Sequence, residues 1–95
     1  MTQPAGLKAV HLRIEGRVQG VGFRRWMKRE ADGLGLRGWA RNTPDAAIEA
    51  VVAGEEDAVA AFCEAATRGP HNARVNGLAM HAVDDEPSGP GFRVL

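Results

Sequence analysis

Hydrophobic and polar residues alternate in the first strongly patterned stretch of the chain. Val10, Leu12 and Ile14 are separated by polar side chains, which predicts a strand with one buried face. The period then changes to that of a helix, with one apolar and one basic side. The apolar side carries Phe23, Trp26, Met27 and Leu34, and the basic side carries Arg24, Arg25, Lys28 and Arg29. Gly33 and Gly35 predict the end of this helix.

The second half of the chain repeats the change from strand to helix. Residues 36–42 and 47–53 predict two strands, joined by a turn with the sequence NTPDA. Acidic residues at 55–57 favour the start of a second helix, which Gly69-Pro70 ends. Its apolar stripe comprises Val59, Phe62, Cys63 and Ala66. A fourth strand begins near Ala73 and changes parity, which predicts a bulge or bend at Asn76-Gly77, and residues 92–94 suit a short final strand.

The predicted order is βαββαβ with a short last strand. Split β-α-β units in this order are typical of the ferredoxin-like α+β sandwich, in which two helices cover one face of an antiparallel sheet. Residues 1–6 carry no such pattern, and we expect a flexible N-terminus there. We expect residues 7–95 to form one domain, since no linker or internal repeat divides them.

Composition restricts the class of protein, and charge points to a kind of ligand. With 44% hydrophobic and 25% charged residues, the 95-residue chain has the composition of a soluble globular protein. It lacks a membrane-length apolar stretch and a signal-peptide pattern, and it has one cysteine, so we expect a cytoplasmic protein. Net charge is zero, but residues 8–41 hold nine basic and three acidic residues. This distribution favours a local positive field over general nucleic-acid affinity.

A glycine-rich turn, GRVQGVGFR at residues 16–24, joins the first strand to the first helix. Glycine allows positive φ, and successive backbone N–H groups in such a turn can form an anion-binding nest next to the helix N-terminus. Arg24 adds a planar guanidinium suited to phosphate. The glycine spacing matches neither the dinucleotide fingerprint nor the Walker loop. Gly-rich turns before helices are more often structural, so the turn alone leaves both interpretations open.

Two motifs make the sequence resemble the acylphosphatase family. Residues 16–24 are similar to its first signature, G-x-V-Q-G-V-x-[FY]-R, and residues 38–42, continuing to Ile48 and Gly54, are similar to its second. Members hydrolyse the carboxyl–phosphate bond of acyl phosphates, so the resemblance implies an enzyme that releases a carboxylate and inorganic phosphate. The similarity runs from about Val10 to the C-terminus. One departure is Ala46, where the second signature has glycine, and a positive φ there would strain alanine.

The resemblance also implies which residues act. Arg24 is expected to bind the phosphoryl group and Asn42 to position the attacking water, with Thr43 orienting the Asn42 amide. The phosphoryl group is expected to accept hydrogen bonds from the loop amides of Val18, Gln19, Gly20, Val21 and Gly22. The chemistry agrees, because phosphoryl transfer depends mainly on positioning and charge stabilisation. A carboxylate leaves without a proton, so no general acid is needed.

Other chemistry-bearing residues have simpler interpretations. We expect Cys63 to be a core residue, because it lies on an apolar stripe. His11, His71 and His81 have no metal-ligand spacing, so we expect neither a metal nor another cofactor.

We expect a monomer that binds neither nucleic acid nor membrane. Two alternatives stay open: a non-catalytic ferredoxin-like module, for instance an RNA-binding one, and an acylphosphatase-like component of a carbamoyl-transfer system. Five aromatic residues, with only Trp39 and Phe92 on strands, argue against RNA binding.

Overall fold

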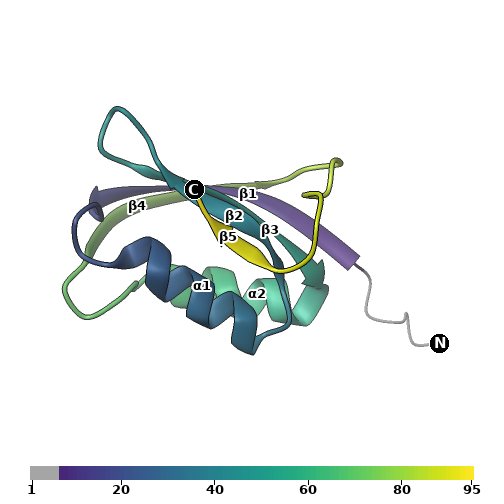
Figure 1. Cartoon of the computed structure of the whole chain (residues 1–95). Helices are drawn as coiled ribbons and strands as arrows, with labels where there is room; N and C mark the ends of the chain where they lie inside the picture. The colour runs from purple at the N-terminus through teal and green to yellow at the C-terminus, as the bar shows by residue number, and fades with distance from the viewer. Residues whose placement is uncertain (1–6) are drawn as a thin grey trace.

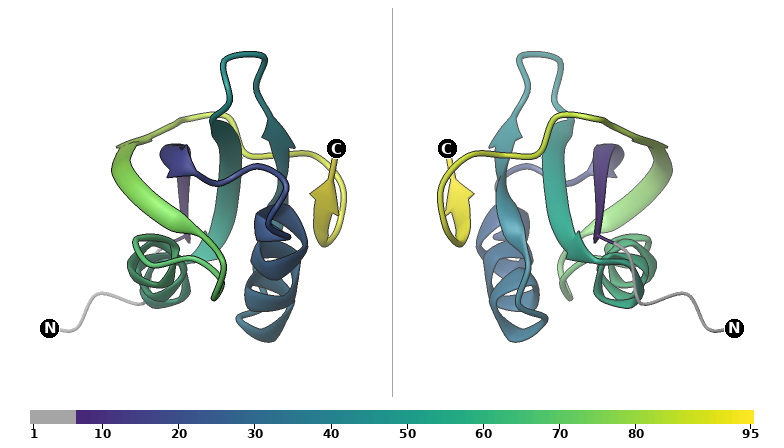
Figure 2. Two further views of the ribbon diagram at one scale, coloured as in Figure 1. Left: turned by 90° about the vertical axis from the view of Figure 1, so that its left-hand side faces the viewer. Right: turned by 90° about the vertical axis from the view of Figure 1, so that its right-hand side faces the viewer.

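The computed structural model describes residues 7–95, so the flexible N-terminus expected at residues 1–6 lies outside the described residues. The strands are β1 (Leu7–Arg17), β2 (Arg37–Asn42), β3 (Ile48–Glu55), β4 (Arg74–Ala82) and β5 (Phe92–Val94), and the helices are α1 (Phe23–Gly33) and α2 (Glu56–Ala66). They form two layers, with both helices on the same face of one sheet (Figures 1 and 2). This is the predicted α+β ferredoxin-like class.

The sheet has the strand order β4-β1-β3-β2-β5. The pairs β1–β3, β1–β4 and β2–β3 are antiparallel, as predicted. The prediction of a wholly antiparallel sheet is wrong at one edge, because β5 pairs parallel to β2 and makes the sheet mixed. After β4 the chain crosses the sheet through residues 83–91 and reaches the β2 edge running in the β2 direction (Figure 2).

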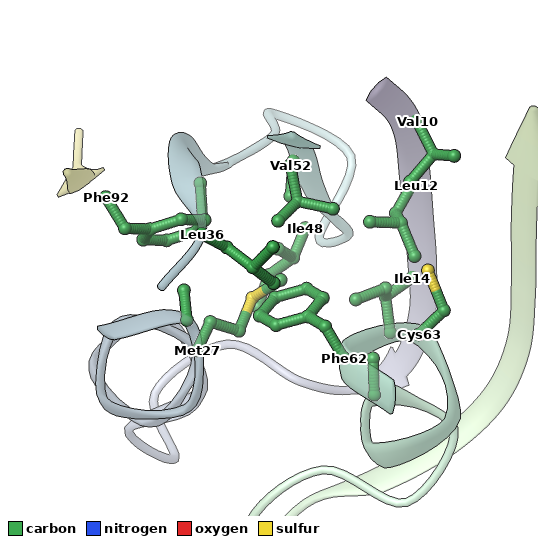
Figure 3. Close-up of a cluster of buried hydrophobic side chains, with 14 of the residues drawn as sticks. Val10, Leu12, Ile14, Met27, Leu36, Ile48, Val52, Phe62, Cys63 and Phe92 are labelled. Atoms are coloured by element: carbon green, nitrogen blue, oxygen red, sulfur yellow. The ribbon is translucent and has the colours of Figure 1, made fainter. Parts of the chain in front are cut away.

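The apolar residues of β1 and β3 that face the helices form the sheet side of the hydrophobic core. Leu12, Ile14, Ile48 and Val52 are fully buried between the sheet and the helices (Figure 3). Phe62 of α2 lies 6.0 Å from Phe92 of β5, centroid to centroid, which ties the last strand to the helical layer. Burial of this apolar surface is the main force that holds the helices against the sheet.

Two local features agree with the sequence prediction. In β1 and β4, Glu15 pairs with Gly77 and Gly16 with Val75, so Asn76 is an extra residue and forms the predicted bulge. At the end of α1, Gly35 has φ 70°, and the N–H of Leu36 donates to the carbonyl of Ala31. This hydrogen bond is the defining contact of a Schellman motif, which ends the helix and turns the chain into β2.

Candidate active site

The loop between β1 and α1 has an open backbone without a capping side chain. Gly22, the N-cap residue of α1, has φ 81° and ψ 19° and makes no side-chain cap hydrogen bond. Gly20 has φ 75°. A Cβ at either position would meet no atom within 4 Å, so a side chain would fit. Glycine is favoured here because the backbone has a positive φ. The first turn of α1 has no acidic residue, so its N–H groups and its positive dipole end are available to an anion.

Arg24 and Asn42 line the same cavity although they lie on different elements. The cavity has a volume of about 240 Å³, and the glycine loop, the start of α1, the end of β2 and β5 all contribute to its wall. Its lining residues are Val18, Gly20, Gly22, Phe23, Arg24, Arg25, Asn42 and Val94. The structure therefore brings together the arginine, the asparagine and part of the loop that the sequence singles out.

The guanidinium of Arg24 is held by Leu95, the residue that follows β5. Its Nη1 donates to the main-chain oxygen of Leu95 at 2.6 Å, and the Leu95 N–H donates to Ala40 of β2 at 2.9 Å. A guanidinium carries further N–H donors in the same plane, so Arg24 can contact Leu95 and still bind an oxyanion in the cavity.

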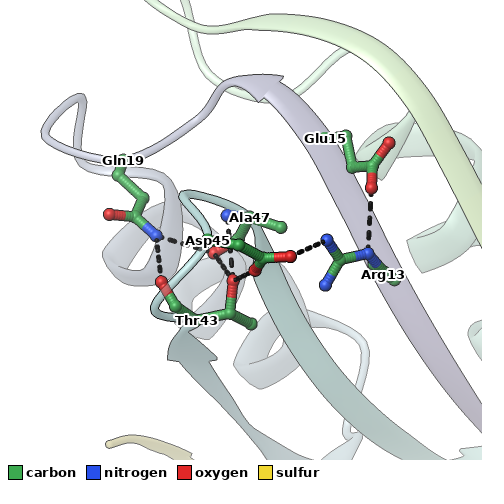
Figure 4. Close-up of polar contacts among 6 residues, drawn as sticks. All are labelled: Arg13, Glu15, Gln19, Thr43, Asp45 and Ala47. Carbon is green, nitrogen blue, oxygen red and sulfur yellow. Dashed lines mark hydrogen bonds and ion pairs between the residues drawn. The ribbon is translucent and has the colours of Figure 1, made fainter.

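Gln19 connects the glycine loop to the turn that follows Asn42, a contact that the sequence did not predict. Its Nε2 donates to the carbonyl of Thr43 at 2.9 Å and to the carbonyl of Ala47 at 2.8 Å (Figure 4). The sequence prediction gave Gln19 only a backbone N–H role. The side chain also fixes the position of the β2–β3 turn relative to the loop.

Thr43 holds the same turn from within. Its hydroxyl donates to Asp45 at 2.5 Å and accepts the Ala47 N–H at 2.9 Å. Among the described residues, these turn contacts occupy the hydroxyl, and no hydrogen bond joins it to the side-chain amide of Asn42. The turn also contains Ala46 at φ 75°, which confirms the condition for strain that the sequence raised.

Arg13 of β1 fixes the turn from its other side. Its guanidinium donates to Asp45 at 2.6 Å and to Glu15 at 2.9 Å (Figure 4). The Thr43 hydroxyl, and after it Arg13, lower the pKa of Asp45 below its usual value, so Asp45 stays ionised at neutral pH. Asn42 is thus followed by a turn that contacts β1 and the glycine loop.

The remaining chemistry-bearing residues lie away from this cavity. Burial raises the pKa of the Cys63 thiol, which is 6% exposed in the core and suits packing better than nucleophilic attack. His11 and His81 stack at 4.9 Å on the sheet face opposite the helices, and His11 Nε2 lies 2.7 Å from Glu49. Within residues 7–95, no three His, Cys, Asp or Glu side chains gather as metal ligands would.

Two larger hollows lack the residues of this chemistry. One of about 650 Å³ lies between α2 and β4, and another of about 600 Å³ lies beside Trp39 and residues 83–88. Neither contains Arg24, Asn42 or the glycine loop. We therefore regard the smaller cavity as the candidate active site, because its lining residues can bind a phosphoryl group although its volume is smaller.

Neither α1 nor α2 is long and apolar enough to span a membrane.

Comparisons with known proteins show the family to which the chain belongs. The family model described as Acylphosphatase matches residues 10–94. An acylphosphatase from Thiobacillus denitrificans is 51% identical over 83 residues, which cover 87% of this chain and 93% of the relative. The structure of an acylphosphatase from Coxiella burnetii has a TM-score of 0.89 at 32% identity and covers 100% of both chains. HypF from T. kodakarensis matches with a TM-score of 0.80 at 32% identity, covering 93% of this chain and 12% of that one.

Proposed function

The chain belongs to the acylphosphatase family and hydrolyses acyl phosphates to a carboxylate and inorganic phosphate, and we propose that Arg24, Asn42 and the loop of residues 18–22 perform this reaction. The observation that carries the assignment is the single cavity in which Arg24, Asn42 and the two loop glycines meet. Arg24 supplies a cation, Asn42 supplies an amide that can bind water, and the glycine loop supplies a backbone that can wrap around an anion.

Arg24 and the backbone N–H groups bind the phosphoryl group. The positive end of the α1 dipole and the uncapped N–H groups favour a negative ligand at the start of the helix. The guanidinium adds charge-assisted hydrogen bonds to the equatorial oxygens. Charge builds on these oxygens in the loose transition state, so donors that are already in place stabilise it without further reorganisation.

Asn42 positions the attacking water. A neutral amide is too weak a base to deprotonate water, but it can both donate to and accept from it. Gln19 and Arg13 hold the turn that follows Asn42, which keeps the amide at a defined distance from the loop. The carboxylate leaves unprotonated, so the site needs no acid opposite the water.

The decisive assay is hydrolysis of benzoyl phosphate by the purified protein. We expect release of benzoate and inorganic phosphate, with competitive inhibition by added phosphate, because product and substrate share the loop and Arg24. The proposed function would be contradicted if the protein bound phosphate but hydrolysed benzoyl phosphate no faster than the uncatalysed reaction. The non-catalytic module is the alternative that this outcome would favour.

We also propose that the protein acts as a cytoplasmic monomer without a nucleic-acid partner. Arg24 and Asn42 meet within one chain, so the proposed reaction requires no residue from a second subunit. Phe92 is 2% exposed, and Trp39, the other strand aromatic among residues 7–95, is only partly exposed, which argues against base stacking on the sheet. Light scattering at assay concentration tests the monomer, and a dimer mass would contradict it.

A further inference from the structure

A second guanidinium lines the cavity beside the one that binds phosphate. Arg25 follows Arg24 in the first turn of α1, is exposed, and contributes to the same wall. Among the ion pairs within residues 7–95, none includes Arg25, whereas Lys28 one turn later pairs with Asp32 at 3.1 Å. The cavity lining contains two arginines and no carboxylate. Arg25 is therefore a second cation at the site, beyond the Arg24 guanidinium to which we assign the phosphoryl group.

The burial of the lining residues indicates where the acyl part of a substrate lies. Val18 and Phe23 are each 1% exposed, so they form the closed end of the cavity. Arg25 and Val94 are exposed, and Val94 reaches 41%, so they form its rim. Because the phosphoryl group occupies the loop and Arg24, the acyl group has to extend along this rim. It would pass an apolar side chain and a free cation.

We propose that Arg25 forms a subsite for a second anionic group on the acyl part of the substrate. The preferred substrates would be acyl phosphates whose acyl group carries a carboxylate or a phosphate near the reacting carbonyl. The second anion pairs with the Arg25 guanidinium, while the bond that breaks stays the carboxyl–phosphate bond and water still supplies the oxygen. This inference rests on the proposed function, since it names a substrate class for the same site.

Rigid aromatic substrates test the subsite without a change in the reaction. The assay compares 3- and 4-carboxybenzoyl phosphate with 4-methylbenzoyl phosphate, and 4-phosphonobenzoyl phosphate separates a preference for phosphate from one for carboxylate. The variant is Arg25→Gln. The matched control is Arg29→Gln, which removes an exposed charge one turn further along α1 that does not line the cavity. Any loss caused only by a weaker positive field on the helix appears in both variants.

We expect Arg25→Gln to lower kcat/KM by about fivefold, the size of a good exposed ion pair, for at least one substrate with a second anionic group on its ring. Hydrolysis of 4-methylbenzoyl phosphate should change less than twofold, and Arg29→Gln should leave the ratio of the two substrates unchanged. High salt should reduce the preference of the unmodified protein. An equal loss on substrates with and without an anionic ring substituent, an equal loss in both variants, or no loss would each overturn the subsite. Failure of the unmodified protein to hydrolyse 4-methylbenzoyl phosphate would count against the proposed function instead.

Discussion

Replacing Gln19 with methionine should separate the role of the loop-to-turn contact from that of packing. Methionine has a similar length and shape but no N–H donor, so the variant removes two hydrogen bonds, of 2.9 and 2.8 Å, from a half-buried side chain. The Thr43 carbonyl keeps the Ala46 N–H as a donor, and the Ala47 carbonyl keeps the Thr43 N–H. The loss should therefore be the net value of two bonds, about 2 kcal/mol in the free energy of unfolding.

That loss is measurable and leaves the protein folded. For a domain of this size, 2 kcal/mol corresponds to a decrease in Tm of about 8–16 °C. The more informative quantity is kcat. With the turn released, Asn42 no longer lies at a fixed distance from the phosphoryl group, and a misplacement of about 1 Å can cost up to roughly 100-fold in rate. We expect kcat for benzoyl phosphate to fall at least tenfold while the competitive inhibition constant of phosphate changes little.

A double-mutant cycle decides whether Gln19 acts through Asn42. If it does, Gln19→Met should reduce kcat strongly in the unmodified protein and hardly at all in the Asn42→Ala background. Purely structural damage would multiply the two losses, because the remaining catalysis by Arg24 would suffer equally in both backgrounds. Multiplicative losses, or a weakened phosphate affinity at constant kcat, would refute the positioning role. Assays well below the lowest Tm of the set keep unfolding out of the comparison.

Four further outcomes follow from the site and the turn. Ala46→Gly should raise the free energy of unfolding by up to roughly 1 kcal/mol, because the φ of 75° strains alanine but not glycine, and an unchanged denaturation midpoint would show that the turn holds alanine without strain. Arg24→Lys should lose most of the activity, since an ammonium cannot supply a planar pair of donors, and near-normal turnover would remove Arg24 from the site. Asn42→Ala should lower kcat by orders of magnitude while phosphate still inhibits competitively, and the opposite pattern would exclude the water-positioning role. Benzoyl phosphate hydrolysis should survive EDTA while glycerol phosphate stays essentially uncleaved, since an alkoxide needs an acid or a metal to leave, and comparable rates on both substrates would reveal a missed catalytic group.

The sequence predicted those parts of the fold that depend on local pattern. The alternation in β1, the helical period of α1 and the parity change at Asn76 each reflect which side of one element is buried, and a residue's neighbours in the chain determine this. The direction of β5 was not predictable in this way. A strand of three residues carries no signal for its partner, and the path of residues 83–91 decides that β5 runs parallel to β2.

In the candidate site too, local motifs were predictable from the sequence and contacts between distant segments were not. The signature motifs pointed to Arg24, Asn42 and the loop, and the structure gathers Arg24 and Asn42 around one cavity. The side-chain bonds of Gln19 could not be predicted, because they depend on the distance between the loop and a turn more than twenty residues later in the chain. Arg13 reaches Asp45 for the same reason. From the sequence we could say only that a positive φ at Ala46 would strain alanine. The turn geometry shows that Ala46 does have a positive φ.

The strand order also has a consequence for how fast the chain folds. Among the strands of residues 7–95, only β2 and β3 are both paired and consecutive in the chain, whereas β1 pairs with β3 and β4, and β2 pairs with β5. Every pairing other than this hairpin requires closure of a long loop, whose entropic cost comes before the contacts that offset it. The protein should therefore fold more slowly than a helical bundle of the same length. The cavity needs the loop after β1, the start of α1, the end of β2 and β5 together, so a newly made chain reaches catalytic competence only in the last stage of folding.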